Sequence, residues 1–288
     1  MSITQPNEEI ANRYTIKLTL AKQLVGSMIV VVRTPDEAYL AEAAGARAVI
    51  PWQMWYSSYK SAYGAAHGPS LNTIRGIMDR VTIPVVGRIR RGHIIEAKAM
   101  EGSYVNFIEE HELLAPITTT EYIPKHKFKY PFIAPAVDLK EALLRIKEGV
   151  SMVRTTYKSE DDVDIIYTFS VVNKIFNEIK TICEMDETSL MAWAAKTTIP
   201  IDLVKMVVRL KKLPVPFFAA GAVLMPIDVA QLMSMGCDGV VVSSRIFGIP
   251  NPETRLQDIT IALEKYNDSD ALAGIIENTG GYGKNFAL

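Results

Sequence analysis

Short apolar runs recur along the chain and alternate with amphipathic stretches, and this alternation constrains the fold more than any other feature. The runs are rich in Val and Ile, as buried strands are. They lie at 27–32, 47–52, 83–89, 104–110, 132–137, 151–156, 215–221 and 239–244. Eight strands that alternate with helices over roughly 250 residues match the (β/α)₈ arrangement. We therefore predict an α/β protein with a (β/α)₈ TIM barrel.

The stretches between the runs carry helix signals. Thr34 is a candidate N-cap, Pro35 suits the first helical position, and Gly45 is a candidate stop. Pro226 and Gly236 repeat this scheme near the other end of the chain. A doubly wound open sheet is the alternative fold, but eight units and the lack of a Gly-rich dinucleotide turn argue against it.

The segment 157–211 interrupts the alternation. It contains about three helical stretches and no strand-like run. We therefore expect a helical insertion after the sixth strand. No low-complexity linker divides the chain, so we expect one domain over 1–288, with the barrel at about 17–266 and short extensions at both ends.

Composition limits the classes of partner. The formal net charge is -1, which gives no reason to expect nucleic acid or an anionic membrane surface. The start "MSITQPNEEI" lacks the basic and apolar regions of a signal peptide, and no apolar run is long enough to span a bilayer. Cys183 and Cys237 lie in apolar segments and are expected to be buried thiols. We expect a cytoplasmic protein.

Polar residues at the strand ends are the candidate site residues, because barrels place function there. The fourth run ends in Glu109, Glu110, His111 and Glu112. Strand alternation sends Glu110 and Glu112 one way and Glu109 and His111 the other, so only one pair is expected to face the barrel mouth. No second histidine cluster is in reach, so we predict no metal site.

The loops after the last two runs resemble the phosphate-binding loops of many barrels. Gly221 and Ala222 follow the seventh run, and Ser243 and Ser244 follow the eighth. Their backbone N–H groups could bind an anion. The alternative is that Gly221 only makes a tight turn and that the serines only cap a helix.

Several long motifs carry a resemblance to a known family. They include "TIPVVGRIRRGHIIEA", "YVNFIEEHELLAP", "EALLRIKEGVSMVRT" and "KLPVPFFAAGAVLMPIDVAQLMSMGCDGVVVSSRIF". From about Lys17 to about Tyr266 the chain resembles the synthase subunit of pyridoxal 5'-phosphate synthase, the Pdx/SNZ family. The resemblance implies a (β/α)₈ barrel that forms hexameric rings paired into dodecamers. It also implies condensation of ribose 5-phosphate, glyceraldehyde 3-phosphate and ammonia, with a glutaminase subunit that supplies the ammonia.

The chain departs from this family at its catalytic positions. Arg88 stands where the family carries the lysine that forms a Schiff base with the pentose, and a guanidinium cannot act as that amine nucleophile. Thr156 stands in place of a second lysine, and Val31 in place of an aspartate. Two acidic positions are retained at the fourth strand end, as Glu109 and Glu110.

The phosphate-binding positions of the family are also changed. Gly221 and Ser244 are kept, whereas Tyr157, Ala222 and Ser243 replace glycines. Arg245 replaces a further glycine, and a pair of arginines before the sixth strand is reduced to Leu144 and Arg145. The resemblance therefore implies a degenerate, non-catalytic member without a cofactor. Arg88 is expected to pair with Glu109 or Glu110, or less favourably to hold a phosphorylated ligand together with Arg245.

Two functions remain open from the sequence. The first is a non-catalytic paralogue that assembles with itself as a hexamer or dodecamer, or with an active synthase subunit as a hetero-oligomer, and so stabilises or regulates vitamin B6 biosynthesis. The second is a lyase with an altered route, in which Lys158 replaces the lost amine. Docking of a glutaminase subunit is left open. The helical stretch 164–185 has apolar residues on more than one face, which favours a subunit contact unless the insertion packs on itself.

Overall fold

Eight parallel strands form a barrel in the computed structural model, which describes residues 5–52, 68–112, 114, 123–157 and 164–278. The hydrogen-bonded order is β2-β1-β8-β7-β6-β5-β4-β3, and a parallel bridge between Val49 and Val85 connects β2 to β3. The strands are β1 Ser27–Val32, β2 Ala48–Pro51, β3 Val86–Arg90, β4 Phe107–His111, β5 Phe132–Ala136, β6 Met152–Thr155, β7 Phe217–Ala220 and β8 Gly239–Val242. The predicted (β/α)₈ barrel is confirmed.

Two strands begin three residues later than the apolar runs that predicted them. Pro84 has no N–H to donate, so it joins only through its carbonyl, which accepts from the Val49 N–H at 3.0 Å, and the regular ladder of β3 begins at Val86. Tyr104 has a φ of 63°, in the left-handed region, so the chain turns there before β4 begins. Asn106 bridges these two lead-in segments, because its backbone N–H donates to the Val85 carbonyl and its side chain accepts from the Val85 N–H.

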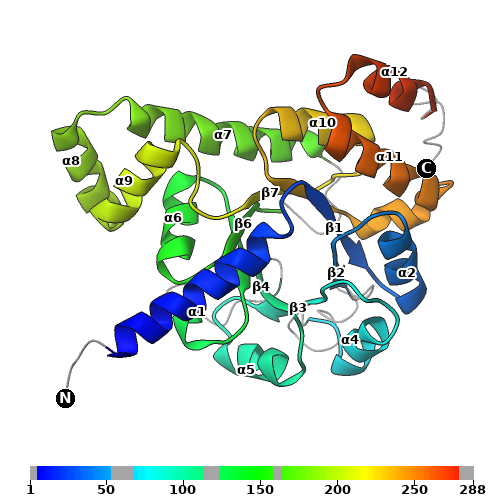
Figure 1. Cartoon of the computed structure of the whole chain (residues 1–288), viewed down its shortest axis with the longest axis horizontal. Helices are drawn as coiled ribbons and strands as arrows, with labels where there is room; N and C mark the ends of the chain where they lie inside the picture. Colours follow the sequence, from blue (N-terminus) through cyan, green and yellow to red (C-terminus); the bar gives the residue numbers. More distant parts are fainter. Residues whose placement is uncertain (1–4, 53–67, 113, 115–122, 158–163, 279–288) are drawn as a thin grey trace.

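Helices cover the outside of the barrel (Figure 1). They are α1 Gln5–Lys22, α2 Pro35–Ala43, α4 Leu71–Met78, α5 Ile94–Gly102, α6 Leu139–Lys147, α7 Ile165–Cys183, α8 Glu187–Thr197, α9 Ile201–Leu210, α10 Pro226–Ser234, α11 Pro252–Lys265 and α12 Ser269–Asn278. Two 3₁₀ turns, η1 Lys125–Lys127 and η2 Ser244–Gly248, complete the elements of the described residues. The Thr34 hydroxyl accepts from the Glu37 N–H at 3.2 Å, so the predicted cap of α2 is confirmed.

The helical insertion after the sixth strand is also confirmed and consists of α7, α8 and α9, which extend to one side of the barrel (Figure 1). Its apolar faces do not require a partner subunit. Val172, Ile175, Ile179 and Ile182 are buried within the chain, and Ile166 is the exposed exception at 72%. Three others are partly buried against the same core, namely Ile165, Phe169 and Phe176. These residues therefore give no support for a subunit contact, because the insertion packs on itself and on the barrel, and the ring oligomer stays a prediction.

The barrel interior has an apolar base and a polar mouth. Inward side chains of the lower layers form one apolar cluster with Ala21 and Leu24, so the end of α1 closes the bottom of the barrel. On β3, β4 and β6 the next inward positions toward the mouth are charged, and they are described below. Cys183 and Cys237 are free thiols, the latter buried. No helix among the described residues is both long enough and apolar enough to cross a membrane.

Candidate active site at the barrel mouth

Three fully buried charged side chains meet inside the mouth of the barrel. Arg88 on β3 is the register neighbour of Glu109 on β4, so parallel pairing brings the two together. The Arg88 Nε donates to Glu109 Oε2 at 2.5 Å, and the Arg154 Nε, from β6, donates to Glu109 Oε1 at 2.5 Å. Glu109 and Arg154 are 0% exposed and Arg88 is 2% exposed. One carboxylate therefore binds two arginines.

A second carboxylate completes the network. Arg154 donates to both carboxylate oxygens of Glu112, at 2.9 and 2.7 Å. Glu112 Oε1 also accepts from the Thr156 hydroxyl at 2.9 Å and from the Tyr157 N–H at 2.5 Å. Grouping Glu112 with Glu110 was wrong, because β4 ends at His111 and alternation does not extend into the turn that follows.

The network is balanced in charge, with two arginines and two glutamates. Burial alone would raise the pKa of Glu109, but Arg88 and Arg154 outweigh it and hold that pKa at about 2. The pKa of Glu112 is likewise lowered, because Arg154 outweighs burial. Burial, followed by Arg88 and Arg154, lowers the pKa of His111 well below 6.5. The mouth therefore holds two carboxylates and a neutral imidazole at neutral pH.

Glu110 faces the other way from Glu109. Its carboxylate lies 2.6 Å from the Lys125 ammonium and accepts from the Gly92 N–H at 2.9 Å. Lys125 in turn pairs with Glu148 at 2.8 Å. The two retained acidic positions are thus on opposite faces of β4, and Arg88 pairs with Glu109 rather than with Glu110.

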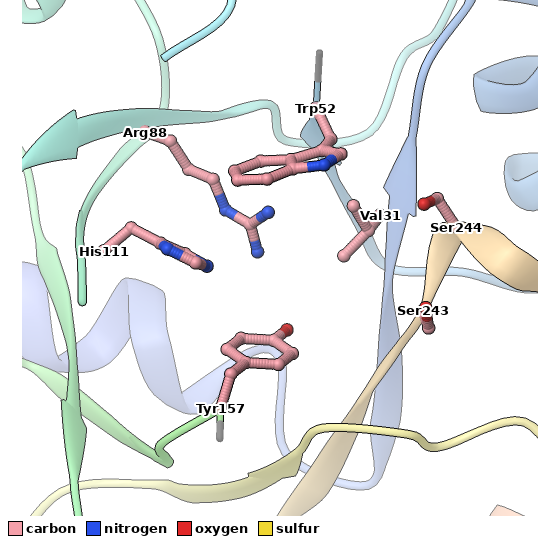
Figure 2. A pocket seen from close by; sticks show the side chains of 7 residues that line it. All are labelled: Val31, Trp52, Arg88, His111, Tyr157, Ser243 and Ser244. Carbon is pink, nitrogen blue, oxygen red and sulfur yellow. The ribbon is translucent and has the colours of Figure 1, made fainter. Parts of the chain in front are cut away.

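A small cavity of ≈ 50 Å³ opens above the network (Figure 2). The residues that line it are Val31, Trp52, Arg88, His111, Tyr157, Ser243 and Ser244. The His111 ring lies between two aromatic rings, with centroids 5.2 Å from Trp52 and 5.3 Å from Tyr157. The Arg88 guanidinium lies 4.8 Å from the centroid of the Trp52 ring. Val31 and Arg88, the positions at which the resemblance implies an aspartate and a lysine, therefore line the same cavity.

The predicted phosphate positions are only partly brought together. Ser243 and Ser244 line the cavity, whereas Gly221 and Ala222 do not. Gly221 has a φ of 104° and Ala222 a φ of 52°, so both lie in the region that favours glycine. The Ser243 hydroxyl accepts from the Arg245 N–H at 3.3 Å and so caps η2. Arg245 is exposed and does not line the cavity, so Arg88 and Arg245 do not form a joint phosphate site there.

The remaining arginines of these motifs hold helices in place. Arg90 bonds to Glu96, in the first turn of α5, through its Nε at 2.7 Å. The Arg91 guanidinium lies 3.4 Å from the carboxylate of Glu141 at the start of α6. In the same helix Arg145 is buried and pairs with Glu148 at 3.1 Å, and Leu144 packs against the core.

Arg154 is the residue that the sequence analysis missed. The signal for it was a positive charge inside the apolar run at 151–156, which can only be buried with a partner. Lys158, the candidate replacement amine, lies outside the described residues. No group of three or more His, Cys, Asp or Glu side chains suited to a metal occurs in the described ranges.

Comparisons with known proteins identify the family. The family model described as "SOR/SNZ family" matches residues 13–220. Pyridoxal 5'-phosphate synthase subunit PdxS of Desulfitobacterium hafniense is 39% identical over 269 residues, which cover 93% of this chain and 92% of that protein. The probable pyridoxal 5'-phosphate synthase subunit PDX1.1 of Oryza sativa subsp. japonica is 34% identical over 279 residues, or 97% of this chain and 87% of that protein. The chain therefore belongs to the SOR/SNZ family, the family of the pyridoxal 5'-phosphate synthase subunits that its motifs resemble.

Proposed function

We propose that the chain is a non-catalytic paralogue of the pyridoxal 5'-phosphate synthase subunit and acts in vitamin B6 biosynthesis by assembly rather than by chemistry. The observation that carries this proposal is that Arg88 and Thr156, which stand where the resemblance implies lysines, are both bound to carboxylates. Arg88 is bound to Glu109, and the Thr156 hydroxyl donates to Glu112. Schiff-base chemistry needs an amine that can lose its proton, which a guanidinium cannot do and a hydroxyl cannot replace.

The surroundings of the cavity support the same proposal. None of the described residues that line it is a lysine. Lys98, on α5, is exposed on the outside of the barrel. The aspartate position is Val31, which is 5% exposed and cannot transfer a proton. An altered lyase that uses Lys158 is the second candidate function, favoured only by the place of Lys158 two residues beyond Thr156.

The role that remains is assembly into rings, either with itself or with an active synthase subunit. The motifs that carry the scaffold are retained, and exposed apolar side chains are available for contacts. Ile16 on α1 is 61% exposed and Ile95 on α5 is 62% exposed. Mixed rings would let the chain change the stability or the output of the active enzyme.

The proposal is tested by incubating the purified chain with ribose 5-phosphate, glyceraldehyde 3-phosphate and ammonium, and following pyridoxal 5'-phosphate by absorbance. We expect no product, with the Desulfitobacterium hafniense relative as the positive control. The triple change Arg88→Lys, Thr156→Lys and Val31→Asp should still give little product, because Tyr157 and Ala222 remain. Product formation by the unaltered chain would reject the proposal and favour the lyase.

The assembly half is tested separately by co-expression with an active synthase subunit and native mass spectrometry. We expect intermediate masses that correspond to mixed rings. Pure species alone would remove the regulatory role.

A further inference from the structure

Two buried polar groups face the cavity and have no hydrogen-bond partner within the described part of the chain. They are the Arg88 Nη2 amino group and the Tyr157 hydroxyl. Figure 2 shows both pointing into the space between them. The Arg88 Nε and the Tyr157 ring are already engaged, by Glu109 and by His111 respectively, so these side chains are held in place. A buried donor without a partner is unfavourable, so a ligand that accepts from both groups would be stabilised.

The charge around the cavity favours an anion. Among the described residues that line the cavity, Arg88 alone carries a formal charge at neutral pH, since the pKa of His111 lies well below 6.5. The two carboxylates of the network bind arginines and do not line the cavity. A guanidinium pairs best with planar oxyanions, and a phenol hydroxyl can donate to a second oxygen of the same group.

The volume limits the group that fits inside the cavity to a small one. A water molecule needs about 10–15 Å³ of cavity volume, so ≈ 50 Å³ admits a group of about three to five non-hydrogen atoms. Pockets for larger organic ligands are about 300–1,000 Å³. We propose that the cavity binds a small planar oxyanion of the carboxylate or nitrate class between Arg88 and Tyr157. Such binding goes beyond the proposed function and depends neither on ring assembly nor on the loss of catalysis.

The test is thermal unfolding of the full chain in sodium formate and in sodium chloride at equal ionic strength. The variant Tyr157→Phe keeps the ring that contacts His111 and Arg154 but removes the hydroxyl. Its matched control is Tyr39→Phe, because Tyr39 also lies under an arginine, Arg80, but on the outer helix α2.

We expect formate, and not chloride, to raise the unfolding midpoint of the unaltered chain and of Tyr39→Phe in a saturable way. In Tyr157→Phe the apparent Kd for formate should rise roughly tenfold or more, because the lost hydrogen bond is to a charged group. Calorimetric titration with formate should give the same ranking without unfolding the protein.

Three results would overturn the inference. The first is no saturable effect of formate on the unaltered chain, and the second is equal affinity for formate in Tyr157→Phe. The third is protection by ribose 5-phosphate that Tyr157→Phe abolishes, since this would mean that the site recognises a sugar phosphate rather than a small planar oxyanion. Pyridoxal 5'-phosphate formation is measured in a separate assay, so failure here leaves the proposed function intact.

Discussion

Replacing Glu109 by glutamine removes the carboxylate that joins both arginines at the barrel mouth. Glutamine has nearly the same shape but no charge. Arg154 would keep its two bonds to Glu112, whereas Arg88 would lose the ion pair with its Nε. Because Arg88 is 2% exposed, its charge could not be solvated instead.

The magnitude follows from the charge state of Glu109. Its pKa falls from 4.5 to about 2 in the folded protein. At about 1.4 kcal/mol per pKa unit, this corresponds to about 3 kcal/mol of stabilisation of the carboxylate. Removing one partner of a buried ion pair costs about 3–5 kcal/mol of folding stability, which agrees with the value from the pKa. For a chain of this size the unfolding midpoint should fall by roughly 6–10 °C.

The assay is thermal unfolding and urea unfolding at pH 7, both followed by circular dichroism. Glu187→Gln is the matched control, because Glu187 pairs with Lys205 at 2.7 Å but is 73% exposed, and it should unfold at the midpoint of the unaltered chain. The depressed pKa of Glu109 also implies that its contribution is present above pH 4.5 and is lost as the pH falls toward 2. A fall of less than about 1 kcal/mol in the free energy of unfolding of Glu109→Gln would refute this account of the mouth, since it lies far below the cost of breaking a buried ion pair.

Three further predictions concern pH, backbone and assembly. Because folded His111 is neutral while the unfolded chain takes up its proton below pH 6.5, the free energy of unfolding should fall by up to about 1.4 kcal/mol per pH unit below 6.5, and His111→Gln should flatten this slope in acid-unfolding curves. Ala222→Gly should leave the unfolding midpoint unchanged or raise it, because Ala222 has a φ of 52°, in the region that favours glycine. Ala220→Gly in β7 should lower the midpoint, and a larger fall for Ala222→Gly than for Ala220→Gly would contradict this. Analytical ultracentrifugation should find a ring oligomer, and a monomer at micromolar concentration would end the assembly proposal.

The fold was predictable because strands and helices differ in the period of their apolar residues. Six of the eight strands begin within two residues of the apolar runs that predicted them, and the insertion lies where the alternation stops. The starts of β3 and β4 were missed because Pro84 and Tyr104 act through the backbone, which an apolar pattern does not reveal. The contacts of α7 could not be predicted for a related reason, since a pattern shows that a face is apolar but not which neighbour covers it.

The site was less predictable than the fold. The Arg88–Glu109 pair follows from two charged residues at adjacent strand ends, so it could be expected. The part played by Arg154 could not, because β6 is not hydrogen-bonded to β4 but lies beyond β5, and only the closed barrel turns the inward side chains of both strands toward each other. Glu112 turns toward the same arginine from a loop, where strand alternation no longer sets the direction of a side chain.

The most direct test of the central claim is mass spectrometry of the intact chain after incubation with ribose 5-phosphate and reduction with borohydride. Reduction would trap any Schiff base as a stable pentose adduct on a lysine. Because Arg88 and Thr156 occupy the lysine positions, we predict a spectrum with the unmodified mass alone. A stoichiometric adduct that peptide mapping assigns to Lys158, or to any other lysine, would contradict the claim that this chain has lost its catalytic chemistry.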